Sequence, residues 1–236
     1  MVDSDSSATG TLYVVSTPIG NLGDLSPRAR EVLSEVQIIA CEDTRVTGSL
    51  LAHVGIERPK LVSYRNENET VRAQELVEDL LTGQTVAVVS DAGTPTISDP
   101  GFRLVRACQK AGIPISVVPG PCAIVAAIAA SGLPSDRFYF CGFLPPKSAA
   151  RRRFLEEHLD FPSTLVVYES VHRIEKFLDE IVDVLGEERI LSVSRELTKK
   201  FETTATGRAA DVRQSVLSRA RKGEFVVLIA PKTFDL

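Results

Sequence analysis

Short apolar runs alternate with longer amphipathic segments along almost the whole chain. Residues 85–90 (TVAVVS) are apolar without interruption at their centre, as in a strand that is covered on both faces. In residues 68–81, by contrast, apolar positions recur at helical spacing, and Gly83 supplies the stop. The same strand pattern predicts strands at residues 12–16, 38–41, 61–63, 115–118, 138–141, 164–168, 189–194 and 224–229.

Helices are expected between most of these strands. Ser26-Pro27 opens the first of them, because proline at the first helical position loses no hydrogen bond. The others are predicted at residues 102–111, 122–131, 149–158, 172–185 and 211–221. Such an alternation is typical of α/β proteins and favours parallel strands, at least in the first half of the chain.

Pro119-Gly120-Pro121 is the best candidate for a domain boundary. It predicts an N-terminal α/β domain over residues 11–118 and a C-terminal α/β domain over residues 119–236. Residues 1–10 (MVDSDSSATG) are acidic and serine-rich and lack the basic and apolar regions of a signal peptide, so we expect a disordered tail. The most apolar stretch, residues 113–130, is interrupted by three prolines and is expected in the core, not in a membrane.

Composition narrows the choice of partners and cofactors. The chain has 236 residues and a formal net charge of −4, so a nucleic acid would have to be attracted by local basic patches. The four cysteines form no CxxC pair. Glu169-x-x-His172 has the spacing of a carboxylate–histidine metal motif, but it occurs once where a di-metal bundle needs two. No metal is therefore expected.

Three predicted strands end in loops that are rich in glycine and proline, at residues 17–24, 91–101 and 119–123. Glycine lets a backbone approach a ligand closely, and proline stiffens a loop before binding. Each loop alone could be a simple tight turn, but ligands of open α/β sheets bind where such strand exits gather. The GxGxxG and Walker patterns are absent, which disfavours nicotinamide and nucleoside-triphosphate cofactors.

Seven segments in these loops and elsewhere carry a family resemblance, in order and with compatible spacing from about Gly10 to the last predicted strand. They are STPIGNLGD (16–24), ACEDTR (40–45), VSDAGTPTISDPG (89–101), PGPCA (119–123), GFLPPK (142–147), YESVHR (168–173) and RELTKK (195–200). Together they resemble the ribosomal RNA small subunit methyltransferase I family, a branch of the tetrapyrrole (corrin/porphyrin) methylase superfamily.

The resemblance implies two α/β domains of the tetrapyrrole methylase type, with S-adenosyl-L-methionine in the cleft between them. It also implies a cytoplasmic homodimer that methylates the 2′-oxygen of a decoding-region cytidine, in free 16S rRNA or in the small ribosomal subunit. By position in the motifs, the cofactor is expected to contact Pro18, Ser90, Asp91, Ala92, Gly93, Thr94, Pro95, Ile97, Ser98, Pro119, Gly120, Ala123, Tyr168 and Glu169.

A general base is expected for this reaction, because a ribose 2′-hydroxyl is a poor nucleophile. The candidates are Glu42, Asp43, Glu169, His172 and Glu196. We place Asp43 and Glu169 first as catalytic residues. Each has a purely structural alternative: Asp43 could belong to a salt-bridged helix cap with Arg45, and Glu169 could hold Arg173.

Basic side chains near the same motifs predict the RNA-binding surface, because lysine and arginine bind phosphates. These residues are Arg65, Lys147, Arg151, Arg152, Arg153, His172, Arg173, Arg195, Lys199 and Lys200. A solvated helix face is the alternative for residues 151–153. Two rival functions also stay open: methyl transfer to a tetrapyrrole, which predicts an apolar pocket in place of a basic rim, and a non-catalytic RNA- or cofactor-binding protein.

Overall fold

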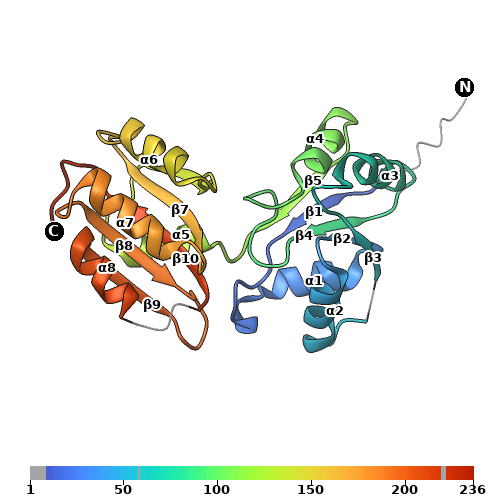
Figure 1. Cartoon of the computed structure of the whole chain (residues 1–236). Helices are drawn as coiled ribbons and strands as arrows, with labels where there is room; N and C mark the ends of the chain where they lie inside the picture. Colours follow the sequence, from blue (N-terminus) through green and yellow to red (C-terminus); the bar gives the residue numbers. More distant parts are fainter. Residues whose placement is uncertain (1–8, 58, 219–221) are drawn as a thin grey trace, which may run out of the picture. The chain divides into compact units, whose positions relative to one another are not determined.

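The chain forms two α/β units, and each contains one five-stranded sheet (Figure 1). The computed structural model describes residues 9–57, 59–218 and 222–236. The first unit ends at Cys122 and the second begins at Ala123, so Pro119-Gly120-Pro121 belongs to the first. Most of the predicted N-terminal tail lies outside the described residues. Gly10 is an exception, because it is buried and donates its N–H to the Leu80 carbonyl at 2.8 Å.

All strands of the first sheet are parallel, in the order β3-β2-β4-β1-β5. These strands are β1 (Leu12–Val15), β2 (Ile38–Cys41), β3 (Lys60–Ser63), β4 (Val86–Val89) and β5 (Ile115–Val118). The helices of this unit are α1 (Pro27–Glu35), α2 (Thr44–His53), α3 (Glu69–Leu81) and α4 (Phe102–Lys110), and Leu22–Asp24 forms a 3₁₀ turn.

Helices cover both faces of this sheet (Figure 1). One face packs on α3 and α4, where Leu76 and Leu104 lie in one buried cluster with Val14 of β1. The opposite face packs on α1 and α2, where Leu33 joins Val15 in a second cluster. Burial on both faces explains why these strands are apolar runs without polar alternation.

The second sheet is mixed, in the order β6-β7-β10-β8-β9. Its strands are β6 (Phe138–Phe143), β7 (Thr164–Ser170), β8 (Ile190–Arg195), β9 (Thr203–Arg208) and β10 (Glu224–Ile229). Within this second sheet, only the β6–β7 pair of the described strands is parallel. The helices are α5 (Ala123–Ser131), α6 (Ser148–Glu157), α7 (Ile174–Leu185) and α8 (Ala209–Leu217).

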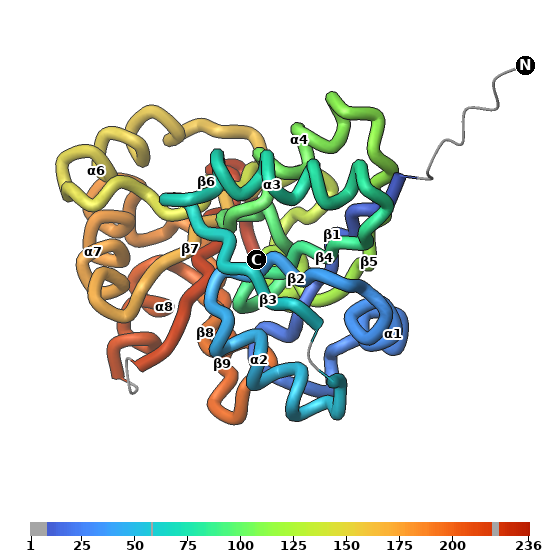
Figure 2. The backbone as a smooth tube through the Cα atoms, turned by 90° about the vertical axis from the view of Figure 1, so that its right-hand side faces the viewer, coloured from blue at the N-terminus to red at the C-terminus, as the bar shows by residue number. Residues whose placement is uncertain are grey.

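Helices α6, α7 and α8 cover one face of the second sheet, and Figure 2 shows them stacked along one side of this unit. Leu155, Phe177 and Val212 bring these three helices into a single core with Val167 and Val227 of the sheet. Helix α5 packs against the other side, on β8, β9 and β10.

The prediction missed two elements. Helix α2 was not expected, and neither was β9, which pairs with β8 as an antiparallel hairpin and breaks the alternation of strands and helices. The end of the helix predicted at residues 211–221 lies partly outside the described residues. Within the described part of the chain, no helix has both the length and the apolar surface that crossing a bilayer requires.

Candidate cofactor and catalytic site

The loops after β1 and β4 are joined by a two-way backbone link. Thr17 donates its N–H to the Gly93 carbonyl at 2.9 Å, and Gly93 donates its N–H back to the Thr17 carbonyl at 3.1 Å. The Thr17 hydroxyl donates to the Ser90 carbonyl at 3.1 Å. Because β4 and β1 are neighbours in the sheet, both loops lie at its carboxyl edge. Two of the three predicted ligand loops therefore form one structure.

The loop after β5 closes onto the same place. The Thr94 hydroxyl donates to the Pro121 carbonyl at 3.2 Å and lies 3.0 Å from the Ser16 hydroxyl. The backbone at Gly120 approaches Ser16 so closely that a Cβ atom there would lie 2.9 Å from the Ser16 Cβ. We call residues 17–24, 91–101 and 119–122 the three-loop corner. Its exposed members include Ala92, Ile97, Ser98, Pro119 and Gly120.

We expect Gly120→Ala to lower the free energy of unfolding by about 1–3 kcal/mol, the usual range for overpacking. Ser16 cannot move aside easily, because it is 2% exposed and its hydroxyl is held by Thr94. Urea unfolding measures the change. Gly23→Ala is the control, since a Cβ there meets only the Asn21 side chain, at 3.2 Å. Equal stability of the two variants would show that the corner tolerates the added methyl group.

Carboxylates gather in and beside the three-loop corner, in the segments that follow β2 and β4. The Asp91 carboxylate accepts the backbone N–H of Asp43 at 3.1 Å, which connects the two strand exits. Burial, with the nearby charge of Asp91, raises the pKa of Glu42. Burial also raises the pKa of Asp99 to about 6, and the charges of Glu42 and Asp91 add to this effect while a Ser90 hydrogen bond opposes it. Asp99 was absent from the predicted base candidates, although it stands inside the predicted loop.

The contacts of Asp43 match its structural alternative, a salt-bridged helix cap with Arg45. It is the N-cap of α2, and its Oδ1 accepts the Arg45 N–H at 2.8 Å. Its Oδ2 forms an ion pair with Arg45 at 2.6 Å. The hydrogen bonds from Arg45 hold the pKa of this carboxyl well below its usual range. A carboxylate that is stabilised in this way is a weak base, so the geometry supports a capping role.

The contacts of Glu169 also favour its structural alternative over the predicted base role. Its Oε1 accepts from the Arg173 Nε at 2.8 Å and from the Ser170 N–H at 2.6 Å, and its side chain has no exposed surface. Its Oε2 is buried with no hydrogen-bond partner among the described residues. Successive strand residues point to opposite faces, so Glu169 and Tyr168 cannot both turn toward one ligand. Glu169 holds Arg173, as its structural alternative proposed.

The second sheet gathers most of the predicted RNA-binding residues at one edge. Strands β7 and β8 are both antiparallel to β10, and β6 is parallel to β7, so β6, β7 and β8 end at the same edge. The loops that follow these ends carry Lys147, His172, Arg173, Lys199 and Lys200, and Arg195 ends β8. Lys147, His172 and Lys200 are exposed. Lys199 forms ion pairs with Glu196 and Glu224, and these carboxylates offset its positive charge.

The three arginines of α6 do not form one surface. Arg151 is only 2% exposed and forms a buried ion pair with Glu180 at 2.7 Å, so the structure contradicts its predicted RNA contact. Arg152 forms an exposed ion pair with Asp183, and Arg153 is exposed. Helical geometry explains the difference, because successive residues are rotated by about 100° and three in a row cannot face the same way.

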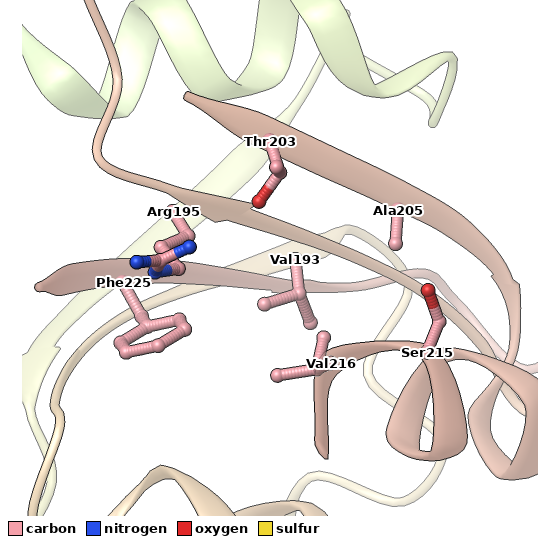
Figure 3. Close-up of a pocket in the computed structure, with 7 residues that line it drawn as sticks. All are labelled: Val193, Arg195, Thr203, Ala205, Ser215, Val216 and Phe225. Atoms are coloured by element: carbon pink, nitrogen blue, oxygen red, sulfur yellow. The ribbon is translucent and has the colours of Figure 1, made fainter. Parts of the chain in front are cut away.

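Two further predicted arginines hold neighbouring backbone. Arg65, in the first unit, is exposed and donates its Nε to the Glu42 carbonyl at 2.9 Å. Arg195 donates its Nε to the Lys222 carbonyl at 2.6 Å. Arg195 also lines a small cavity with Val193, Thr203, Ala205, Ser215, Val216 and Phe225 (Figure 3). At about 10 Å³ this cavity has room for about one water molecule, which is too little for a cofactor or nucleotide.

Pro18 and Pro95 are buried within the three-loop corner, whereas Ala123, Tyr168 and Glu169 belong to the second unit. In the described part of the chain, no group of three His, Cys, Asp or Glu side chains is arranged to hold a metal ion.

The class of protein follows from comparison with known families. The family model for Tetrapyrrole (Corrin/Porphyrin) Methylases matches residues 11–213, and the chain belongs to this family. A Xylella fastidiosa protein called Ribosomal RNA small subunit methyltransferase I is 52% identical over 225 residues, which covers 94% of this chain and 82% of that protein. A Vibrio cholerae protein of the same name is 50% identical over 220 residues, covering 92% and 76%.

A solved structure shares the fold. Uroporphyrin-III C-methyl transferase from Thermus thermophilus, complexed with S-adenyl homocysteine, matches with a TM-score of 0.61 and 18% identity, covering 93% of this chain and 96% of that one.

Proposed function

We propose that this chain transfers the methyl group of S-adenosyl-L-methionine to ribosomal RNA of the small subunit. The finer target is the 2′-oxygen of a decoding-region cytidine, as the family resemblance implies. The observation that carries the proposal is the three-loop corner, together with relatives about half identical that are named for this activity. A homodimer in the cytoplasm is part of the same proposal.

The residues of the three-loop corner fit the methyl donor. When bound, S-adenosyl-L-methionine supplies an electrophilic methyl group on a positively charged sulfur. The small exposed residues Ala92, Ser98 and Gly120 leave the backbone open to close approach. The carboxylates of Asp91 and Asp99 place negative charge beside them, which favours a cationic ligand. The uroporphyrin-III C-methyl transferase structure of the same fold is complexed with the demethylated product, S-adenyl homocysteine.

Asp99 is the base that the geometry favours over Asp43 and Glu169. Its carboxyl is half-buried and stands among Glu42, Asp91 and the Ser90 hydroxyl. A pKa of about 6 leaves it ionised at neutral pH but more basic than an ordinary aspartate. Asp99 can therefore accept a proton from an RNA hydroxyl that is held next to the donor.

The exposed basic side chains of the second sheet's edge and of α6 form the proposed phosphate-binding surface: Lys147, Arg153, His172 and Lys200. Arg152, Arg173, Arg195 and Lys199 of the same unit support it with charge, although each also contacts the protein. Arg65 is a separate proposed RNA contact on the first unit. A basic rim of this kind favours RNA over a tetrapyrrole as the methyl acceptor.

Replacing Lys147 with alanine should weaken binding to small ribosomal subunits and make it less sensitive to salt. One lost phosphate contact reduces the slope of log affinity against log salt concentration by about one. Filter binding at several salt concentrations measures the slope. Lys110→Ala, an exposed lysine at the end of α4, is the matched control. Identical slopes for the two variants would remove Lys147 from the phosphate-binding surface.

The proposed activity is tested with labelled S-adenosyl-L-methionine and small ribosomal subunits from cells that lack this protein. We expect label in the rRNA, and mapping of 2′-O-methyl groups should find one cytidine that is modified only when the protein is added. Label in a porphyrinoid precursor but not in RNA would support a tetrapyrrole methylase. Binding of donor and RNA without transfer would support a non-catalytic protein. Sedimentation of the purified chain tests the homodimer.

A further inference from the structure

A β-bulge places two phenylalanine rings of β6 on the same face of the second sheet. Phe140 pairs with Val166, and after the bulge Phe143 pairs with Tyr168. Gly142, at the bulge, has a φ of +64°, a conformation that glycine adopts without strain. Without the extra residue, alternation would turn Phe143 toward the face that α6, α7 and α8 cover. The bulge therefore aims Phe143 away from the core.

The rings of Phe140 and Phe143 contact the Tyr168 ring of the neighbouring strand, but Phe143 also stays exposed to solvent. The Phe140 ring meets the Tyr168 ring edge-on at 5.0 Å between centroids, and the Phe143 ring lies 5.6 Å from it at 58°. Phe143 is nonetheless 58% exposed. Helix α5, which packs on this side of the sheet, lies against β8, β9 and β10, at the far end from β6. An aromatic ring that is held by packing against a neighbouring ring, and is exposed on its other side, can stack with a planar ligand group.

Basic residues lie in the loops that follow the two strands of this ring pair. Lys147 follows Phe143 after a short proline loop, and His172 follows the end of β7. Arg173 donates its Nη1 to the Leu144 carbonyl at 3.2 Å, which ties the two loops together. Residues 138–155 contain no aspartate or glutamate, and of their four cations Lys147 and Arg153 are exposed, while Arg151 and Arg152 are paired with Glu180 and Asp183. The surroundings of the rings are therefore suited to a polyanion that also carries flat aromatic groups.

We infer that Phe143, seated on Tyr168, stacks with an unpaired base of the RNA, while Lys147 and His172 hold the adjoining phosphates. Single-stranded nucleic acids are bound in this way, by aromatic rings for bases and cations for the backbone. The inference rests on the proposed function, because it names the surface that receives the RNA. The inference also explains the role of the bulge at Gly142, which turns Phe143 toward the exposed face.

The test is methyl transfer to small ribosomal subunits that lack the modification. We expect Phe143→Ala to reduce kcat/KM for the subunits about 10-fold or more, because base stacking on an aromatic ring is lost. Phe143→Tyr should keep near wild-type activity, and Phe143→Leu, apolar but without a ring, should lose it. Phe138→Ala is the matched control, since this 45% exposed phenylalanine lies at the opposite end of the same strand.

Salt dependence separates stacking from charge. For Phe143→Ala, log kcat/KM plotted against log salt should run parallel to the wild type, whereas Lys147→Ala should flatten the line. Calorimetry with S-adenosylhomocysteine checks that each variant keeps its fold and its donor affinity.

Three results would overturn the inference: full activity of Phe143→Leu, equal losses in Phe143→Ala and Phe138→Ala, or dissociation of a dimer by Phe143→Ala in sedimentation. A wild-type protein that methylates no RNA would instead refute the proposed function.

Discussion

Replacing Arg151 with alanine should lower the free energy of unfolding by about 3–5 kcal/mol, the range for breaking a buried ion pair. The guanidinium donates through Nε and Nη2 to both oxygens of Glu180, each at 2.7 Å. Its Nη1 donates to the carbonyls of Pro145 and Pro146. Without Arg151, the buried Glu180 carboxylate keeps the Ser148 hydroxyl as its one hydrogen-bond partner among the described residues, and the loop after β6 loses two hydrogen bonds from the guanidinium.

Urea unfolding of the variant measures this loss. Arg152→Ala is the matched control, because it removes the next arginine of the same helix, whose ion pair with Asp183 is exposed. Its stability should change by no more than about 1 kcal/mol. The double variant Arg151→Met/Glu180→Leu should recover most of the loss, since no charge is left buried. If Arg151→Ala and Arg152→Ala are equally stable, the buried pair contributes nothing that an exposed pair does not.

Replacing Asp99 with asparagine should reduce kcat for methyl transfer about 10²- to 10⁴-fold, the usual contribution of a general base. In the wild type the rate should rise as the pH passes through about 6, because only the ionised carboxylate accepts a proton. Asp43→Asn is the control, since the amide can still cap α2 and Asp43 is not the proposed base. Rates near wild type for Asp99→Asn would exclude Asp99 as the base.

The same substitution should stabilise the protein at high pH. The pKa of Asp99 is raised from 3.8 to about 6 in the folded state, so folding favours its protonated form. Its contribution to stability is therefore full below about pH 4 and is lost as the pH rises through 6. At pH 8, Asp99→Asn should be about 1 kcal/mol more stable than the wild type, since solvent screens part of the penalty. At pH 4 the two should match.

Most strands could be predicted from the sequence because burial on both faces makes them apolar runs. Helix α2 could not, because residues 44–53 contain Gly48 and two threonines, which have low helix propensity. Its start is fixed by the Asp43 cap, and its register by the burial of Leu51. Strand β9 (TTATGR) carries no large apolar side chain, so its pairing with β8 decides its structure.

The candidate site, too, could be predicted only in part from the sequence. Strand order places the three loops together, so their convergence could be predicted from the α/β pattern. The burial of Arg151 could not, because its partner Glu180 lies 29 residues away and only the packing of α6 on α7 brings them into contact. For Asp43 and Glu169 the sequence offered two roles each, and only the contacts of Arg45 and Arg173 decide between them.

The hydrogen bonds among Thr17, Gly93, Thr94 and Pro121 also restrict how this sheet edge can change. Each of the three loops hydrogen-bonds to the backbone of another. If one loop were replaced by that of a distant relative, donors and acceptors in the other two loops would lose their partners. Chimaeras with relatives of different acceptor specificity should therefore work only when all three segments are exchanged as a set, and new acceptors are more easily acquired through the second sheet.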